Sequence, residues 1–358
     1  MADMQMLLIV NPGATSTKVA VFDDSAVVLE KSVKHPLGEM EQYPHIVDQL
    51  GYRQERVVAV LHEGKIELKS LSAVVGRGGL LKPCKGGTYR VNEAVLRDLR
   101  AGVSGEHASN LGGLLAHAIA APLGIPAFIA DPVVVDEIAE VARVSGMPEI
   151  ERKSIFHALN QKAMARRAAR EMGKDYADAN FIVAHIGAGA SVGAHRRGRV
   201  VDVNNTLNGE GPFSPERSGG VPVGDLVALC FSGRHTREEI DKKIVGKGGL
   251  MAYLGTNDNA EIVRRIEAGD KRARLIYEAM AYQAAKEIGA CAAVLKGEID
   301  AIVLTGGFAH DAAFVELIKE RVSFIAPVKV YPGEHEMIAL AEAGLRVLRG
   351  EEEALEYE

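Results

Sequence analysis

The sequence has few cysteines and no pattern that would place them in a metal site or a disulfide framework. Its 358 residues include only Cys84, Cys230 and Cys291, which are far apart and odd in number. No CxxC pair or cysteine–histidine grouping is typical of a zinc site, and no regular spacing indicates paired cysteines. Such usage fits a reducing compartment, and we therefore expect a cytoplasmic protein.

Excess positive charge and long apolar runs are also missing. The net charge of −6 argues against a general nucleic-acid or anionic-membrane partner. The N-terminal residues MADMQMLLIVNPG lack a basic segment, and their apolar run is too short for a signal peptide. The longest apolar stretch, residues 112–135, is interrupted by His117, Pro122 and Pro126. It predicts a buried helix followed by a buried strand, not a membrane span.

What is present is an ordinary soluble composition, 47% hydrophobic and 25% charged, with a length that suggests two domains. Strand-like and helical patterns alternate along the chain, which predicts α/β architecture with largely buried sheets. The strands are expected at residues 7–10, 18–22, 26–34, 73–75, 127–129, 181–186, 191–195, 199–203, 299–305 and 328–331. The helices are expected at residues 107–121, 155–172 with Ser154 as N-cap, 273–296, 311–322 and 337–348.

The opening of the chain is echoed in its second half. Residues 181–205 repeat the order of apolar strand, Gly-rich turn, second strand and third strand that begins at Leu7. This predicts a duplicated domain, with one copy at residues 1–150 and the other at 151–336. We expect the helix at 337–350 to pack back on the first copy, and the final residues EEEALEYE to form a solvated end.

Three Gly-containing turns have the composition of phosphate-binding loops. NPGATSTK offers Gly13 for close backbone approach, hydroxyls at Thr15, Ser16 and Thr17, and the cation of Lys18. It lacks the Walker spacing, and a plain hairpin turn with a surface lysine is the alternative.

The other two turns follow buried strands. HIGAGAS, from His185, places Gly187 and Gly189 where backbone N–H groups could meet a phosphate. VLTGGFAHD places Gly306 and Gly307 ahead of a helix N-terminus. A Gly-rich hairpin and a tight strand–helix turn are the respective alternatives.

Single charged residues stand out in otherwise apolar or Gly-rich segments. Arg77 and Arg217 lie in Gly-rich loops, where a guanidinium suits a carboxylate or a phosphate. Asp131 ends a strand before a proline, His157 lies in an apolar helical segment, and Glu336 opens the last helix. A turn cap, a core histidine and a helix-dipole acid are the structural alternatives for these three.

Together and in this order, these motifs resemble the acetate and sugar kinase, Hsp70 and actin superfamily. The run NPGATSTK, VVGRGG, FIADP, SIFHALNQKA, HIGAGAS, PERSGG, LTGGFAHD and GEHEMIA is similar to the carboxylate kinases, and within them to the butyrate kinases. The resemblance implies two duplicated ribonuclease H-like (actin-like ATPase) domains with ATP in a cleft between them. It also implies a homodimer or higher oligomer, with ATP or ADP and Mg²⁺ as cofactors.

The resemblance further implies a role for each motif. It assigns catalysis to Arg77, Asp131, His157 and Arg217, and Mg²⁺ binding to Asn11 and Glu336. It assigns ATP and phosphate binding to Asn11, Thr15, Ser16, Lys18, His185, Gly187, Ala188, Gly189, Asp258, Gly306, Gly307, Phe308, His310 and Asp311. Departures from acetate kinase at Ala14, Ala188 and Ala260 argue against acetate as the preferred substrate.

The expected reaction is reversible phosphorylation of a short-chain carboxylate by ATP, with butyrate, isobutyrate or another branched-chain acid as acceptor. An ionised carboxylate needs no general base, so cations that neutralise charge explain the residue types. An acetate or propionate kinase is the alternative within the family. A sugar kinase, which needs a catalytic base, and an Hsp70-like or actin-like nucleotide switch are the alternatives outside it.

Overall fold

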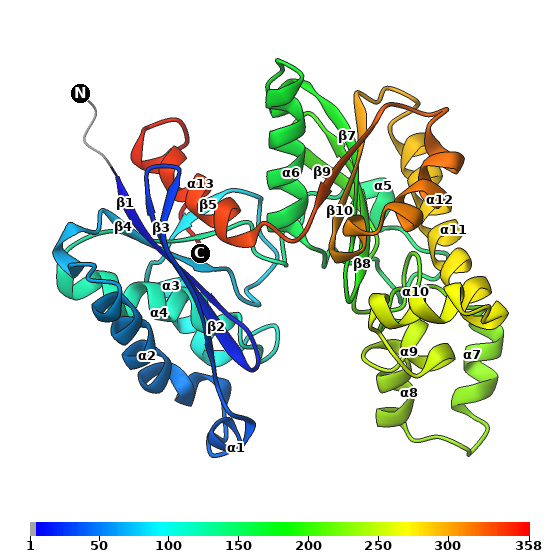
Figure 1. Ribbon diagram of the computed structural model, residues 1–358, viewed down its shortest axis with the longest axis horizontal. Helices are drawn as coiled ribbons and strands as arrows, with labels where there is room; N and C mark the ends of the chain where they lie inside the picture. The colour runs from blue at the N-terminus through cyan, green and yellow to red at the C-terminus, as the bar shows by residue number, and fades with distance from the viewer. Residues whose placement is uncertain (1–4) are drawn as a thin grey trace. The chain divides into compact units, whose positions relative to one another are not determined.

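The computed structural model describes residues 5–358, which form two compact units (Figure 1). The first unit contains the described residues up to Asp136 together with His335–Glu358, and the second contains Glu137–Glu334. The chain thus enters the second unit earlier than residue 150, where Gly, Pro and charged residues suggested a boundary. That segment belongs to the second unit, where Val144 and Glu151 form an antiparallel bridge.

The first unit is built on a six-stranded sheet of order β3-β2-β1-β4-β6-β5. Strands β1 to β3 form an antiparallel meander, β4 and β6 run parallel to β1, and β5 pairs antiparallel with β6. The three-residue β5 was not expected, because it is too short to show a periodic pattern. The strands are β1 Met6–Pro12, β2 Ser16–Asp23, β3 Ala26–Lys34, β4 Ala73–Arg77, β5 Thr88–Arg90 and β6 Ala127–Ala130.

The second unit repeats this topology with a five-stranded sheet of order β11-β10-β7-β8-β9. Its meander of β7, β8 and β9 is again followed by two strands parallel to the first. The prediction of duplicated α/β domains is confirmed, whereas the cleft between them stays a prediction. The strands are β7 Asn180–Ile186, β8 Ala190–Arg196, β9 Arg199–Val203, β10 Ala301–Gly306 and β11 Val328–Pro332.

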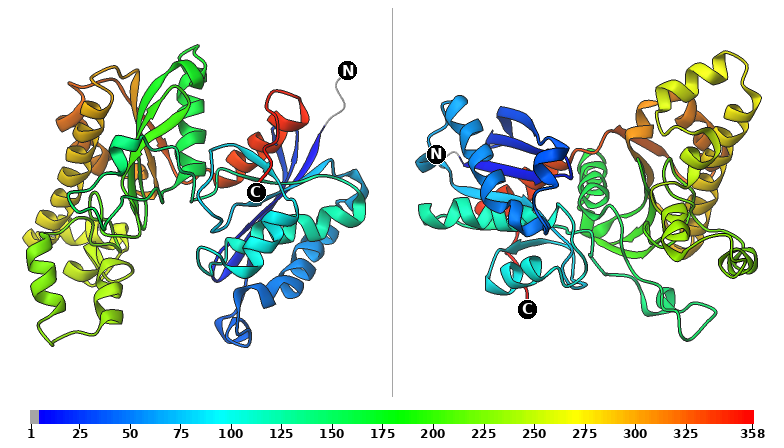
Figure 2. Two further views of the ribbon diagram at one scale, coloured as in Figure 1. Left: turned by 180° about the vertical axis from the view of Figure 1, so that it is seen from behind. Right: turned by 90° about the horizontal axis from the view of Figure 1, so that it is seen from below.

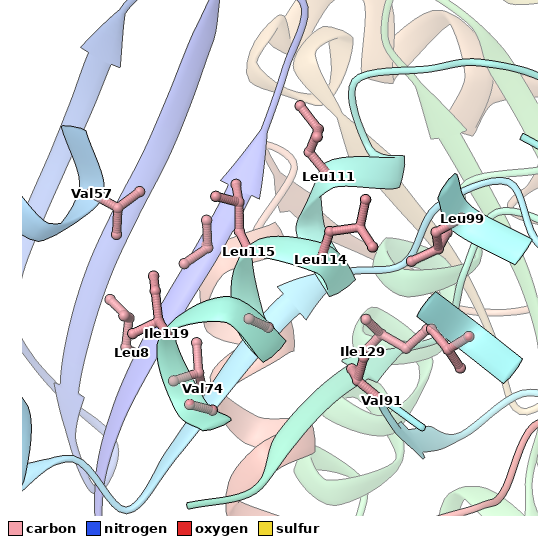
Figure 3. Close-up of a cluster of buried hydrophobic side chains, with 14 of the residues drawn as sticks. Leu8, Val57, Val74, Val91, Leu99, Leu111, Leu114, Leu115, Ile119 and Ile129 are labelled. Atoms are coloured by element: carbon pink, nitrogen blue, oxygen red, sulfur yellow. The ribbon is translucent and has the colours of Figure 1, made fainter. Parts of the chain in front are cut away.

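Helices cover both faces of the first sheet. Leu8 and Val74 point to one face and pack with Leu115 of α4 in an apolar core (Figure 3). On the other face, a side chain at Gly344 of α13 would collide with Leu7, so the helix lies close against the strands. The helices are α1 Leu37–Met40, α2 Leu50–Glu63, α3 Glu93–Ala101, α4 Asn110–Ala120 and α13 Glu336–Leu348.

The second sheet is covered in the same manner, by α6 on one face and by α11 and α12 on the other (Figure 2). The Ala-rich sequence of α11 forms one long helix, as its composition predicted. Helix α5 precedes the meander in the chain, and α7 to α10 follow it. The helices are α5 Glu140–Arg143, α6 Ala158–Glu171, α7 Val223–Cys230, α8 Arg237–Ile244, α9 Gly249–Leu254, α10 Asn259–Glu267, α11 Lys271–Val294 and α12 Ala312–Val322.

Three expectations about the ends of elements are wrong, the first of them at α4, which begins at Asn110 and not at His107. Helix α6 begins at Ala158 with His157 as its N-cap residue, not at Ile155 after Ser154. The C-terminal residues are not a solvated end, because Leu355 bonds to the backbone of β5 and Tyr357 is 6% exposed. The Tyr357 hydroxyl donates to Asp98 at 2.9 Å, which fastens the end of the chain to the first unit.

The apolar stretch at residues 112–135 forms most of α4 and β6, as the sequence predicted. Residues within it are buried in the core of the first unit. None of the helices in residues 5–358 is long and apolar enough to cross a membrane.

Candidate active site

In the first unit, three predicted site residues meet at the ends of β1, β4 and the start of α13. The Asn11 amide donates to a Glu336 carboxylate oxygen at 2.7 Å, and Arg77 pairs with the same carboxylate at 3.0 Å. His107 lies beside Arg77 at the start of α4, where its Nδ1 contacts the Ser109 hydroxyl at 2.8 Å. Burial, and then the charge of Arg77, hold the pKa of His107 below its usual range. His107 was not among the predicted site residues, although it begins the helix predicted at residues 107–121.

The same group has the oxygen ligands that Mg²⁺ prefers. Asn11 is 4% exposed and Glu336 side-chain atoms are 14% exposed, so both are held in fixed positions with limited access to solvent. Mg²⁺ is usually bound by one or two protein oxygens and completed by substrate phosphates and water. One amide oxygen and one carboxylate therefore fit the ion. Among residues 5–358, no group of three or more His, Cys, Asp or Glu side chains is arranged to hold a metal ion.

Lys18 lies across from Asn11 in the antiparallel register of β1 and β2. Residues paired in this way project to the same face of a sheet. Lys18 and Thr15 are exposed and Ser16 is half-buried, so these predicted phosphate contacts are accessible. The expectation for Thr17 is wrong: its hydroxyl is buried and bonded to His35 Nε2 at 2.8 Å.

A residue that the sequence analysis missed holds this turn. Arg53 of α2 is fully buried, and its guanidinium donates to the Gln49 side-chain oxygen at 2.8 Å. An arginine on an amphipathic helix is ordinarily exposed to solvent, so the sequence did not indicate that Arg53 would be buried. The guanidinium donates to the carbonyls of Gly13, Ala14 and Ser16 and to the Thr17 hydroxyl.

Asp131 occupies a strained position at the carboxyl end of β6. Its φ is +37°, a conformation that residues with a side chain seldom adopt. The buried carboxylate accepts from the Gly87 N–H at 2.8 Å, and the Asp131 N–H donates to the Gly87 carbonyl. Ala130, the residue before Asp131, pairs with Arg77 in the sheet. Asp131 therefore follows β6 at the edge of the sheet where β4 ends with Arg77. Strain of this kind often accompanies functional sites.

In the second unit, His157 and His185 stack on each other. Their ring centroids are 3.9 Å apart and the rings are 17° from parallel. His157 comes from the N-cap of α6 and His185 from the end of β7. His185 Nδ1 bonds to Asn160 Oδ1 at 2.8 Å. Two imidazoles predicted to serve separate roles are therefore in direct contact.

The loop that follows His185 is shaped to receive Arg217. A side chain at Gly189 would lie 2.1 Å from the Arg217 guanidinium, so only glycine lets the arginine lie against the backbone. Arg217 also donates to the Thr206 carbonyl at 3.0 Å, and burial lowers its pKa despite nearby Glu216. The Gly187 N–H is bonded to the Gly189 carbonyl within the loop, and the Ala188 carbonyl accepts from the Ser214 hydroxyl. The structure thus brings Arg217 to the predicted phosphate loop.

The segment after β10 forms a tight turn against the same loop. Gly306 has a φ of +90°, and a side chain there would lie 2.4 Å from the Ile186 carbonyl oxygen. Gly307 and His310 are in the 3₁₀ turn that follows, and both are exposed. The Phe308 side chain belongs to the core of the second unit, so contacts with a ligand at this position would come from its backbone.

Asp311 is the N-cap of α12, and it is tied to α10 and α11. Its carboxylate accepts from Asn259, at 2.8 Å, and from the Tyr277 hydroxyl. Burial opposes ionisation, but these hydrogen bonds hold the pKa of Asp311 below its usual range. Asp258 is exposed and caps α10. Asn259, which the sequence analysis did not single out, has a buried side-chain oxygen with no hydrogen-bond partner among the described residues.

Comparison with known proteins identifies relatives of the whole chain. The model of the acetokinase family matches residues 148–336. The chain is 59% identical to butyrate kinase 1 of Clostridium acetobutylicum over 99% of its own length and the whole of that protein. It is 56% identical to butyrate kinase 2 of the same organism over 98% of this chain and 99% of the other.

The fold also matches a solved structure. The crystal structure of Porphyromonas gingivalis acetate kinase superposes with a TM-score of 0.79 at 21% identity, covering 95% of this chain and 99% of that one. The fold is therefore that of two duplicated actin-like ATPase domains. With a family model over more than half of the chain and two relatives above 50% identity over nearly all of it, the chain belongs to the acetokinase family.

Proposed function

We propose that this protein is a butyrate kinase, which transfers the γ-phosphoryl group of ATP to butyrate or a branched short-chain acid and gives ADP and an acyl phosphate. The observation that carries the proposal is the identity of 59% and 56% to two butyrate kinases over nearly the whole chain. The site geometry supports it, since Arg77 and the predicted phosphate loops lie at strand ends, and Arg217 lies against one of these loops at Gly189.

The chemistry requires charge neutralisation more than proton transfer. A short-chain carboxylate is ionised at neutral pH, so it can attack phosphorus without a general base. Two anions must then approach each other in line, and positioned cations lower the cost. In this proposal Arg77 and Arg217 hold the carboxylate and the transferring phosphoryl group, and Lys18 lies near that phosphoryl group.

We assign Asp131 to orienting these cations rather than to taking a proton. His157 stabilises the charge that develops on the transferring group. Asn11 and Glu336 would hold Mg²⁺, which would neutralise phosphate charge when bound. Since Glu336 already balances Arg77 at 3.0 Å, it fixes the arginine as well.

The nucleotide is proposed to bind to the second unit. His185, Gly187, Ala188 and Gly189 would contact its phosphates, as would Thr15 and Ser16 from the first unit's turn. Gly306, Gly307, Phe308, His310, Asp311 and Asp258 would line the adenosine side. The unpartnered oxygen of Asn259 gives this region an additional acceptor.

We further propose a homodimer in the cytoplasm. Helix α7 has no buried residue, and Val223, Val227 and the adjoining Phe231 are 62%, 50% and 87% exposed. An apolar helix face of this kind suits a second copy of the chain. Sedimentation of the wild-type protein and of a Phe231→Ser/Val227→Ser variant tests the dimer. The small number and wide spacing of the cysteines support a reducing compartment.

The activity is tested by ATP- and Mg²⁺-dependent acyl phosphate formation, trapped with hydroxylamine. The acids are acetate, propionate, butyrate, isobutyrate, valerate and isovalerate. One methylene in an apolar pocket changes specificity by about 1–3 kcal/mol, so neighbouring acids should differ by roughly tenfold or more. A maximum at four or five carbons is expected.

Other outcomes are equally informative. A maximum at acetate would overturn the butyrate preference and keep the carboxylate kinase. No product with any acid, together with slow ATP hydrolysis, would favour a nucleotide switch. Arg77→Ala should abolish acyl phosphate formation, while Arg100→Ala, at an exposed position of α3, serves as the matched control.

A further inference from the structure

A buried chain of polar side chains leads away from His157 into the second unit. His157 Nδ1 is 2.8 Å from the Ser191 hydroxyl, which is 2.7 Å from the Gln161 amide nitrogen. The Gln161 oxygen is 3.0 Å from His195 Nε2, and His195 Nδ1 is 2.8 Å from the Tyr176 hydroxyl. Ser191, Gln161 and His195 are fully buried, so every proton in the chain needs a protein partner.

One contact determines which atoms donate and which accept along this whole series of hydrogen bonds. The Gln161 side-chain nitrogen is also 3.0 Å from the Ser191 backbone carbonyl, which can only accept a hydrogen bond. The nitrogen must therefore face Ser191, and the Gln161 oxygen must face His195. Gly193 makes room for that oxygen, because a side chain there would lie 2.5 Å from it.

The proton positions at the far end follow from this orientation. The Gln161 oxygen accepts, so His195 must carry its proton on Nε2. Burial, followed by the charges of Lys162 and Arg166, lowers the pKa of His195 well below its usual range. A neutral His195 protonated on Nε2 has a bare Nδ1, and this nitrogen accepts from the Tyr176 hydroxyl.

The proton positions at the near end follow in the same way. The Ser191 hydroxyl oxygen accepts from the Gln161 amide, so its own proton points to its remaining partner, His157 Nδ1. Nδ1 then acts as an acceptor, and neutral His157 carries its proton on Nε2. The neighbouring His185 carries its proton on Nδ1 instead. The Asn160 side-chain nitrogen donates to the Glu334 carbonyl, so the Asn160 oxygen accepts from His185 Nδ1.

We infer that Gln161 is a positioning residue that fixes His157, through Ser191, in the form with its proton on Nε2. The inference rests on the proposed function, in which His157 stabilises the transferring phosphoryl group. An Nε2–H can donate to a phosphoryl oxygen, whereas the other neutral form would present a lone pair to it. Gln161 lies in the first turn of α6, where its N–H donates to the His157 carbonyl at 2.9 Å, and both side chains contact the Ser191 hydroxyl.

The test compares the full-length Gln161→Met and Ser191→Ala variants with the wild type. Two measurements are made: steady-state butyrate kinase kinetics, and ¹⁵N–¹H correlation spectra of histidine-labelled protein with His157 assigned by a His157→Gln variant. Gln54→Met is the matched control, because Gln54 is half-buried in the first unit and donates to the Ala118 carbonyl at 3.4 Å, away from the buried hydrogen bonds around Gln161.

We expect the wild-type spectrum to place the His157 proton on Nε2, and both variants to lose that preference. We expect kcat to fall about 10-fold to 100-fold, the scale of one buried hydrogen bond, with KM values changed by about twofold or less. A wild-type proton on Nδ1, or a kcat of either folded variant within about twofold of the wild type, would overturn the inference. Should Gln161→Met not fold, Ser191→Ala gives both readouts. An inactive wild type would refute the proposed function, while the spectrum would still decide the proton position.

Discussion

The buried ion pair of Lys162 and Glu137 should be among the most sensitive points of the second unit. The Lys162 ammonium is 2.9 and 3.1 Å from the two carboxylate oxygens and 3.1 Å from the Gly198 carbonyl. Glu137 also accepts from the Val200 N–H at 2.9 Å. The side chains are only 2% and 7% exposed, so water cannot replace a lost partner.

Replacing Lys162 by Met leaves the Glu137 carboxylate buried without its cation. Breaking a buried pair on one side costs about 3–5 kcal/mol, because the remaining charge is uncompensated. In a unit of this size, 1 kcal/mol lowers the melting temperature by about 2–4 °C. We therefore expect Lys162→Met to lower the melting temperature of the second unit by about 6–20 °C.

The sharper form of the prediction is the double variant. Glu137→Gln alone should also destabilise strongly, whereas Glu137→Gln with Lys162→Met removes both charges and should recover most of the loss. Differential scanning calorimetry suits the measurement, because the chain has no tryptophan for fluorescence. Lys31→Met, which breaks an exposed pair with Glu63, is the control and should cost less than about 1 kcal/mol. Additive single effects, or a Lys162→Met loss no larger than the control, would refute the reasoning.

Three further predictions concern the first unit. Arg53→Met should cost about 1–3 kcal/mol, because the buried Gln49 oxygen loses its donor; an unchanged urea midpoint would contradict this. Burial, with help from nearby arginines, lowers the pKa of His35 to about 4, so between pH 6.5 and 4 the unfolded chain takes up a proton that the folded chain does not. The protein should therefore become less stable as the pH is lowered through that window. In the His35→Asn variant the urea midpoint should depend less on pH, and equal slopes of midpoint against pH in variant and wild type would argue against this. Leu355→Ala should cost about 1–2 kcal/mol by thermal unfolding, while Leu37→Ala, at a position 65% exposed, should cost almost nothing; equal effects would mean that the C-terminal residues are not docked in solution.

Local sequence patterns predicted ten of the eleven strands in residues 5–358, but they missed helices such as α2 and α3. Strands β3 and β9 have the predicted bounds, and the repeated meander indicated the duplication that both sheets show. These features depend on alternating side chains and on Gly-rich turns, which are properties of short segments. The start of α6 was harder, because Ser154 is a good N-cap residue by type and the backbone of the following residues still does not enter the helix.

For the site residues, the sequence indicated what chemistry each side chain could perform, but not which side chains it would contact. The sequence singled out Arg77 and Glu336 separately, and the family resemblance added Asn11, but their contact joins residues that are 66 and 259 positions apart. It expected a phosphate-facing hydroxyl at Thr17, which the structure buries against His35. A hydroxyl next to two others carries no local sign of which one the sheet turns inward.

The sequence by itself determined the α/β class, the duplication, the Gly-rich turns and the set of cations, since each follows from residue type and spacing within a segment. Only the tertiary structure decided that Arg53 holds the turn, that the last residues pack on β5, and that Gln161 orients the groups behind His157. Those facts depend on which distant side chains share a space closed to water. There, every donor must meet an acceptor, and no local pattern records the pairing.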